Sequence, residues 1–537
     1  MARKAKRRTP ANRRTLGRGP LGIDPAILEQ LLVALRSDDT QGASLAEELD
    51  SYIADLLDED AGESDAEATF SRAADMQNRL NDIRIAANGG DREAHRELEE
   101  GLAVVDAAAQ TGDLPGHAVM LLFQMFGEAE IDPGDALREV ILANIHSARS
   151  PDSAVEMRLS DAVASLAELD EQVAQSSFAA MIRYMPSAAR YEFVHALGGH
   201  AQETARAVLL GCLLDADSEL VRIAANGLIA SACNAPVPNR LVERLVLIRG
   251  LVPAPMHPTV DATIAALRSR ALPPVAREPL ELVKCIASVC DGAGAQSLIA
   301  LMRRGKTHVL ATFLVKTDSG LADAMVLNDF SKRDFDAMTK AMGLTLVPVS
   351  PALIQRRLAI ALAISHSKGT TATFGFVEAL EALGIAALRP EAIEPESLLD
   401  ELLADTPPLV PLTLAEAAGR LDDDDLTGTW FEAGPASDGR LDGLRGAKQR
   451  QKAALAYIEE RRVYWAAQCA NSALILRDSG KPLGPLWQHF AVIGQHFAGS
   501  EPVANNLLAQ VMAQRTADAH ESQRFAGFPP ASRSYSR

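Results

Sequence analysis

The chain has 537 residues, 47% of them hydrophobic and only 4% aromatic, and its formal net charge is −18. This length and apolar content suffice for several packed cores, which excludes an intrinsically disordered chain. Abundant alanine and leucine beside so few aromatic residues favour close-packed helices over β-sandwiches and barrels. No apolar run approaches the roughly 20 residues that span a bilayer, so we expect no membrane partner.

The cysteines and the N-terminal residues indicate the cellular compartment of the protein. Five cysteines are spread along the chain without a CxxC pair: Cys212, Cys233, Cys285, Cys290 and Cys469. Such a set is typical of reduced, buried cysteines in a cytoplasmic protein. The basic start lacks the apolar segment of a secretory signal; an organelle transit peptide is the alternative, which the absence of serine in this stretch disfavours.

Residues 1–20 are predicted to be a disordered basic tail, because they contain too few apolar side chains to offset the entropy of ordering. This stretch has eight basic residues and no acid: Arg3, Lys4, Lys6, Arg7, Arg8, Arg13, Arg14 and Arg18. A strongly acidic segment, residues 36–100, follows. The tail is a candidate nucleic-acid element, whereas the acidic body would repel nucleic acid. The alternative is that the tail only increases solubility and has no binding partner.

Residues 21–272 are predicted to form a helical domain. Apolar spacing indicates helices around residues 27–35, 45–57, 70–87 and 92–110, with an acidic loop at 58–67. Helices of about four turns with short connections follow from residue 117. The clearest unit is residues 213–230, which predict the end of one helix, a tight turn and a second helix.

Asp217 or Ser218 is expected to cap the second helix of this unit, and Val221, Ala224 and Ala225 begin its buried stripe. The run from Asp217 through Val221 and Arg222 to the two alanines resembles HEAT-type helical repeats, in which paired helices stack into a solenoid. The resemblance implies an irregular HEAT-like array. Arg222 is expected to bond across to the adjacent repeat. A generic helical array is the alternative.

Residues 280–345 are predicted to form a small, separately folding α+β module. Valine, isoleucine and threonine between turn pairs indicate a four-stranded antiparallel meander, with strands at 282–290, 296–302, 308–315 and 322–328. Residues 296–304 would also suit a short helix. Ser331 is expected to cap a helix, residues 332–342, that covers one face of the sheet.

The rest of the chain is predicted to be helical around an acidic linker. We expect a helical segment at 350–388, a Pro/Gly/Asp-rich linker at 389–447, C-terminal helices at 448–515 and a disordered tail at 516–537. One long helix is expected over about 447–478, ended by Gly480-Lys481-Pro482.

Motifs of catalysis and cofactor binding are weak. Gly305-Lys306-Thr307 has the end of a phosphate-binding loop, but Ala300 stands where its first glycine belongs. Gly292-Ala293-Gly294 better fits a hairpin turn than a dinucleotide loop. His489 and His496 lack a carboxylate partner for a metal, and Asp422 to Asp425 are interpreted as solvated charge. We therefore predict no catalytic, cofactor or metal site.

The fold class predicted is mostly α: an irregular HEAT-like helical array with a small α+β insert and a C-terminal helical region. We interpret the chain as a non-enzymatic cytoplasmic scaffold that binds a protein partner through its helical surface. Trp465 is expected in the core, whereas Trp487, His489 and Phe490 could line a partner groove.

Two alternatives stay open. The first is nucleic-acid or ribosome association through the basic tail. The second is an enzyme: a hydrolase using the turn acids Asp291, Asp318 and Asp323, or a glycosylase, since the DNA alkylpurine glycosylases share the HEAT-like resemblance. The acidic body argues against the glycosylase.

Overall fold

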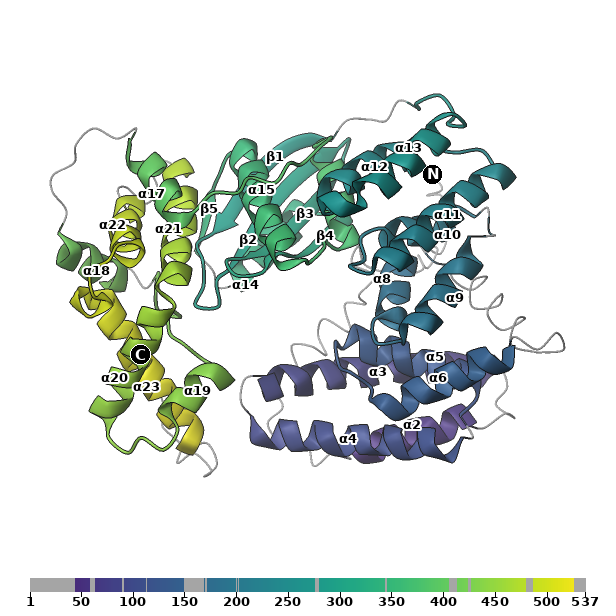
Figure 1. Cartoon of the computed structure of the whole chain (residues 1–537), viewed down its shortest axis with the longest axis horizontal. Helices are drawn as coiled ribbons and strands as arrows, with labels where there is room; N and C mark the ends of the chain where they lie inside the picture. Colours follow the sequence, from purple (N-terminus) through teal and green to yellow (C-terminus); the bar gives the residue numbers. More distant parts are fainter. Residues whose placement is uncertain are drawn as a thin grey trace, which may run out of the picture.

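The computed structural model confirms a mostly helical chain with a small antiparallel sheet and a C-terminal helical region (Figure 1). It describes residues 44–57, 63–88, 91–112, 114–148, 169, 171–198, 200, 202–275, 280–342, 345–404, 413–423, 426–479 and 486–525. The basic tail, the helix expected around residues 27–35, Asp424 and Asp425 lie outside these ranges. No helix in the described ranges has the length and apolarity that a bilayer crossing requires.

The N-terminal helices pack around an aliphatic core that includes Leu45, Leu49 and Val105. They are α2 (Leu45–Leu57), α3 (Glu63–Asn88), α4 (Arg92–Thr111), α5 (Gly116–Glu128) and α6 (Asp135–Ala148). The spacing of leucines predicted α2, and the break after α4 is a left-handed Gly112 with φ of 76°. The acidic loop expected up to residue 67 is shorter than predicted, because α3 begins at Glu63.

The second group of helices packs so that α10 lies against α8, α9 and α11, and α11 also packs on α13. They are α8 (Glu171–Ile182), α9 (Ser187–Leu197), α10 (Glu203–Cys212), α11 (Ser218–Asn234), α12 (Asn239–Leu251) and α13 (His257–Arg268). Small residues permit this packing: a Cβ on Gly198 would lie 2.8 Å from the Cα of Gly227. The HEAT-like identity of the array stays a prediction.

The sheet contains the predicted meander and one further strand, in the order β4-β3-β2-β1-β5. The strands are β1 (Glu281–Ser288), β2 (Ala295–Arg304), β3 (Thr307–Lys316), β4 (Gly320–Phe330) and β5 (Leu346–Pro348). Because β2 is a strand throughout, the alternative of a helix at 296–304 is wrong. Gly294 and Gly305 adopt positive φ in the hairpin turns, as predicted for turn glycines.

Helices cover both faces of the sheet. On one face, Phe335 of α14 (Lys332–Ala341) packs with Ile299 and Leu310, and the Ser331 hydroxyl caps this helix at the Asp334 amide as predicted. On the other face, α15 (Pro351–Lys368) and α16 (Phe374–Ala382) pack against β3 and β4. That second face belongs to the main hydrophobic core.

The outer edge of β1 is only partly paired. β5 pairs with β1 from Ile286 to Ser288, and the Val349 amide donates to the Cys285 carbonyl. A bulge interrupts the register with β2 between Leu282 and Lys284. Residues 281–284 are exposed, including the apolar Leu282 and Val283.

The C-terminal region is more helical than predicted. Its helices are α17 (Pro395–Ala404), α18 (Leu414–Asp423), α19 (Pro435–Leu441), α20 (Ala447–Glu460), α21 (Arg462–Asp478), α22 (Leu486–Ala498) and α23 (Leu507–Phe525). Three of them, α17, α18 and α19, lie in segment 389–447. The prediction that this segment is a linker is therefore wrong. The long helix predicted over 447–478 is divided at Arg461 (φ −98°, ψ 17°), and the last helix continues beyond residue 515.

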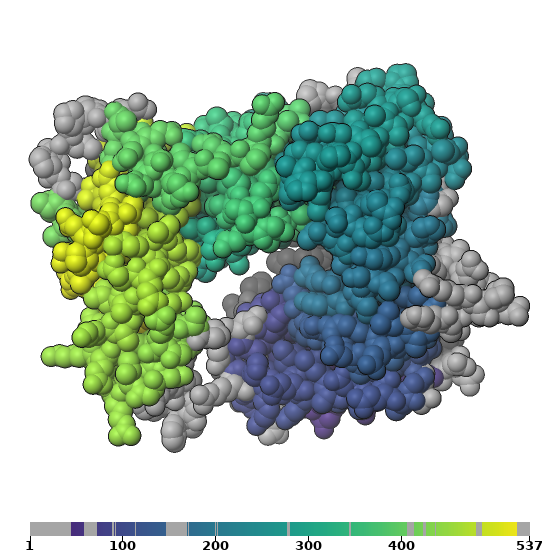
Figure 2. Space-filling view, viewed as in Figure 1, coloured from purple at the N-terminus to yellow at the C-terminus, as the bar shows by residue number. Residues whose placement is uncertain are grey.

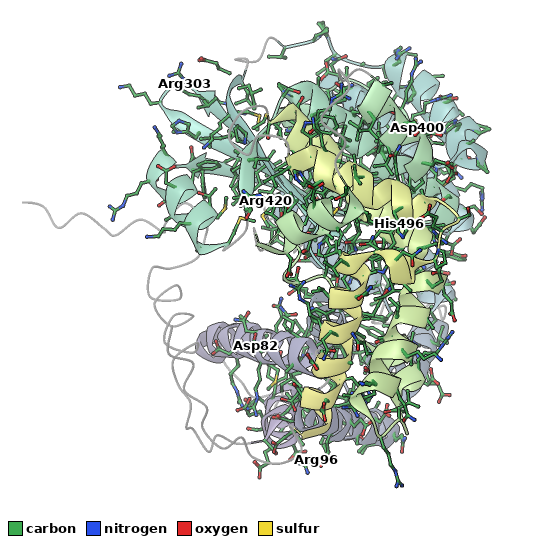
Figure 3. The ribbon with its side chains drawn as sticks, turned by 90° about the vertical axis from the view of Figure 1, so that its left-hand side faces the viewer. Asp82, Arg96, Arg303, Asp400, Arg420 and His496 are labelled. Carbon is green, nitrogen blue, oxygen red and sulfur yellow. The ribbon has the colours of Figure 1, made fainter. Side chains whose placement is uncertain are left out.

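The sheet lies between α8–α13 on one side and the C-terminal helices on the other, and α2–α6 lie below α8–α11 in this view (Figure 1). The space-filling view shows a hollow in this face, below the sheet and between the N-terminal and C-terminal helices (Figure 2). In the turned view, the end of the sheet marked by Arg303 projects from the rest of the molecule (Figure 3).

Candidate functional site

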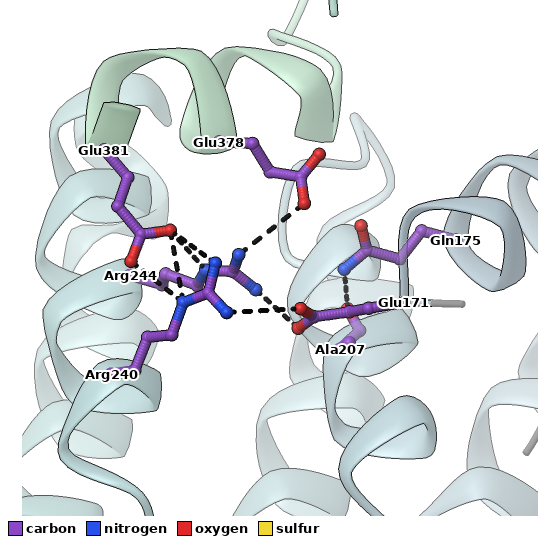
Figure 4. Close-up of polar contacts among 7 residues, drawn as sticks. All are labelled: Glu171, Gln175, Ala207, Arg240, Arg244, Glu378 and Glu381. Atoms are coloured by element: carbon purple, nitrogen blue, oxygen red, sulfur yellow. Dashed lines mark hydrogen bonds and ion pairs between the residues drawn. The ribbon is translucent and has the colours of Figure 1, made fainter. Parts of the chain in front are cut away.

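A cluster of five charged side chains joins three helices that are far apart in the sequence (Figure 4). Arg240 and Arg244 come from one face of α12, since residues four apart on a helix are neighbours. Glu378 and Glu381 come from one face of α16 in the same way, and Glu171 begins α8. These five residues are called the ionic cluster below.

Glu381 and Glu171 accept most of the hydrogen bonds of the two arginines. Arg240 Nε and Nη2 each lie 2.9 Å from an oxygen of Glu381. Arg244 Nε lies 3.1 Å from Glu381 Oε2, and its Nη1 donates to Glu171. Charge-assisted bonds of this kind are strong and directional, so the cluster fixes α8, α12 and α16 relative to one another.

Glu378 is the member with the weakest bonding. Its Oε1 lies 3.6 Å from Arg244 Nη2, which is an ion pair but longer than a hydrogen bond. Neither Arg244 Nη2 nor Glu378 Oε2 has a hydrogen-bond partner among the described residues. Burial raises the pKa of Glu378 to about 7, although the nearby Arg244 acts in the opposite direction. Three carboxyls thus surround two guanidiniums, and the pKa of about 7 places the titration of Glu378 near neutrality.

A cavity of about 920 Å³ lies beside the ionic cluster. Arg240, Glu378 and Glu381 form part of its helical wall, and Arg304, Thr307 and Asp329 form part of its strand wall. Asp329 has φ of 55°, a left-handed conformation that non-glycine residues seldom adopt. Perturbed carboxyls and unusual backbone conformations occur often at functional sites, so this cavity is the candidate site.

A second cavity, of about 560 Å³, adjoins the first and is mainly apolar. Its lining includes Leu282, Met302, Ile354 and Ala386. Both cavities are lined by Leu280, Ala382, Leu383 and Gly384. A ligand that occupied both would therefore meet a charged region at one end and an apolar region at the other.

The residues predicted to be structural in the repeat take different roles. Asp217 caps α11 through Oδ1, which accepts from the Glu219 amide at 3.0 Å, and Tyr191 of α9 donates to its Oδ2 at 2.8 Å. Val221 is buried as expected. The prediction for Arg222 is wrong: its side chain is exposed and pairs with Glu219 of its own helix.

Arg206 makes the contact that was expected of Arg222. This buried side chain of α10 donates to Ser231 Oγ at 3.1 Å, to the Ser231 carbonyl at 2.8 Å and to the Pro236 carbonyl at 2.7 Å. It thereby adds a second donor to the Ser231 carbonyl and ties the segment that follows α11 to α10.

The aromatic residues proposed for a partner groove are mostly core. Phe490 is fully buried, with its ring centroid 5.6 Å from that of Trp430, so its assignment to a binding surface is wrong. Trp465 is buried as predicted, and its Nε1 donates to Glu432 at 2.8 Å. Trp487 and His489 are half-buried, and the Arg477 guanidinium lies 5.5 Å from the Trp487 ring centroid.

The remaining candidates are dispersed. Asp291 accepts from the Ala295 amide in the first hairpin turn, whereas Asp323 lies within β4 and accepts from the Ala324 amide. No hydrogen bond or ion pair joins these two residues to Asp318 in the described ranges. The acid Asp422 pairs with Arg515 at 2.6 Å. Cys233 is exposed, contrary to the expectation that all five cysteines are buried.

The ionic cluster was missed in the sequence, although a signal was present. Arg244 is three or four residues from the buried Leu241 and Ile248 of α12, and Glu378 lies between Val377 and Ala379 of α16. Charges at buried helical positions indicate partners on another helix. Which helix supplies them cannot be deduced from local spacing.

Two family models match parts of the chain. "Y4lR second domain" matches residues 186–271, which include α9–α13, and "Y4lR C-terminal helical domain" matches residues 396–521, which run from α17 into α23. The arginines of the ionic cluster lie within the first match, and its three glutamates lie outside both.

One curated relative is the uncharacterized protein y4lR of Sinorhizobium fredii (strain NBRC 101917 / NGR234). It is 25% identical over 310 residues, which are 55% of this chain and 59% of the relative. The chain therefore matches less than two thirds of that protein's length. No solved structure matches the chain.

Proposed function

We propose that the protein is a non-enzymatic, cytoplasmic interaction protein that binds an extended segment of a protein partner in the two adjoining cavities. The observation that carries this proposal is that the charged and the apolar cavity share four lining residues. Their volumes fall within the range of about 300–1,000 Å³ that is usual for ligand sites. A segment with alternating polar and apolar side chains suits such a pair.

The partly paired edge of β1 supports this choice of ligand. Within the described part of the chain, residues 281–284 have no strand on their outer side, and Leu282 also lines the apolar cavity. Extended peptides commonly add to an open strand edge, where backbone hydrogen bonds give affinity and neighbouring cavities give specificity. The exposed Leu282 and Val283 would be covered by such a segment.

The test is selection of short peptides from a displayed random library on the full chain, followed by affinity measurement by fluorescence anisotropy. Ala386→Trp places a large side chain in the apolar cavity from an exposed position, and Ala392→Trp adds the same bulk outside both cavities. We expect Ala386→Trp to weaken the selected peptides about tenfold or more, equivalent to about 1.4 kcal/mol, and Ala392→Trp to leave them unchanged. Equal binding by both variants, or no enriched peptide, would refute the proposal.

A further inference from the structure

The charged groups around Glu378 balance one another, so its own carboxyl is the one in excess. Facing it are Arg240 and Arg244 from α12, Glu171 from α8 and Glu381 from its own helix. The strand wall adds Arg304 and Asp329, whose opposite charges cancel. The site therefore holds one carboxyl more than it holds cations.

We infer that the larger cavity binds a monovalent organic cation, a primary amine or guanidine, with its charged group on Glu378. A lysine or arginine side chain of the partner segment would supply it. The inference rests on the proposed function for the segment that carries the cation, but the cation site itself stands on the ionic cluster.

The bonding in the ionic cluster supports this placement. Arg240 and Arg244 direct their shortest bonds to Glu381 and Glu171, and no described residue hydrogen-bonds the buried Glu378 Oε2. A carboxyl with a purely structural role would be expected to bond Arg244 directly, because an unsatisfied buried acceptor is costly. An ammonium bound to the Glu378 carboxylate would supply a donor to a group that has, among the described residues, only the long contact with Arg244.

Other ligand classes fit less well. Three carboxyls disfavour an anion such as phosphate. A divalent metal would need several oxygen ligands at about 2.0–2.6 Å, and Glu381 and Glu171 already accept from arginines. An alkyl stem, in contrast, could lie along Leu280 and Leu383, which lead to the apolar cavity.

Binding of a cation must displace the proton of Glu378, since the ionised carboxylate is the form that an ammonium stabilises. Affinity should therefore rise with pH while Glu378 is protonated in the free protein and level off once it is ionised. The amine keeps its own charge over this range, because alkylamines titrate near pH 10.

The experiment measures binding of n-butylamine to the full chain by ligand-observed NMR between pH 5 and 8, with n-butanol as the uncharged match. We expect n-butylamine affinity to rise about tenfold per pH unit well below pH 7 and to level off above it. Glu378→Gln should abolish this binding, because glutamine mimics the protonated carboxyl and keeps the fold. Glu396→Gln, an exposed site on α17, should bind like the native chain.

Two outcomes would overturn the cation site: equal binding of amine and alcohol, or unchanged amine binding by Glu378→Gln. Failure of the proposed peptide binding can be distinguished from failure of the cation site. Amine binding with the expected pH dependence but no enriched peptide would leave the cation site standing and refute the peptide. Enriched peptides that need no basic residue and bind Glu378→Gln normally would refute only the cation site.

Discussion

Single residues in the ionic cluster carry a consequence for stability that can be measured. The folded-state pKa of Glu378 is about 7, against an ordinary value of 4.5. Between these pH values the folded chain holds a proton that the unfolded chain has released. The stabilisation of the folded chain by this proton is fully present below pH 4.5 and is lost as pH rises through 7.

Glu378→Gln removes the titrating group and with it this pH dependence. We expect the free energy of unfolding of the variant, relative to the native chain, to increase by about 1 to 3 kcal/mol between pH 5 and pH 8. Urea denaturation at several pH values, with Glu396→Gln as the control, measures the difference. Parallel curves for the native chain and Glu378→Gln would show that the carboxyl is not perturbed.

Arg206 and Arg222 offer a second comparison at this scale. Arg206 is buried and bonds carbonyls at the end of α11, whereas Arg222 is exposed and pairs within its own helix. We expect Arg206→Met to lower the free energy of unfolding by about 2 to 4 kcal/mol, since it removes the hydrogen bonds that a buried guanidinium makes to Ser231 and Pro236. Arg222→Ala should have a much smaller effect, because an exposed ion pair within one helix contributes little to stability. Thermal and urea denaturation measure both losses. A larger loss of stability in Arg222→Ala than in Arg206→Met would contradict the prediction.

Local chemistry in the sequence was enough to predict caps but not ion pairs. Asp217 and Ser331 cap the helices that follow them because a side-chain oxygen reaches amides two or three residues ahead. The partners of Arg244 are 73 and 137 residues away. No helical or strand period encodes a contact of that kind, and for the same reason Arg206 was missed.

At the scale of elements, the meander was predictable because β-branched runs and turn glycines alternate. The strand β5 was not, because it has three residues and ends in proline. Segment 389–447 was misjudged because prolines, glycines and aspartates dominate its composition. Its short helices nevertheless bury Leu398, Leu399 and Leu402 against α21 and α22.

Independent folding of residues 280–345 stays a prediction, and the packing favours the opposite outcome. Phe313 and Val326 belong to the core that the sheet shares with α15 and α16. We expect a fragment of residues 280–349 to remain unfolded, and a fragment of residues 280–388 to gain structure because it adds these two helices. Far-ultraviolet circular dichroism and amide NMR dispersion distinguish the two. A well-dispersed spectrum from the shorter fragment would restore the independent module.

At the scale of the whole molecule, composition and period predicted the class of fold, whereas the arrangement depends on contacts between distant helices. The basic tail is a separate matter, since residues 1–18 lie outside the described ranges. Its predicted use is tested by comparing RNA binding of the full chain with that of a chain starting at Gly19.

If the tail engages phosphates, we expect binding only by the full chain and only in dilute salt. Each phosphate contacted should contribute about −0.7 to the slope of log affinity against log salt for single strands. Filter binding at several salt concentrations measures this slope. Equal binding by both chains, or none by either, would remove the tail as a nucleic-acid element.

The position of Glu171 gives the ionic cluster a mechanical meaning. It begins α8, which packs on α5 below and on α10 above, and α8 lies between the N-terminal helices and the upper part of the molecule (Figure 1). The arginines that hold it are shared with Glu381 on α16, beside the cavity. A proton or cation bound at Glu378 changes the charge beside these arginines and thus their electrostatic attraction to Glu171 at the start of α8. Because α8 also packs on α5, a change of charge at the ionic cluster acts where the N-terminal helices join the rest of the molecule.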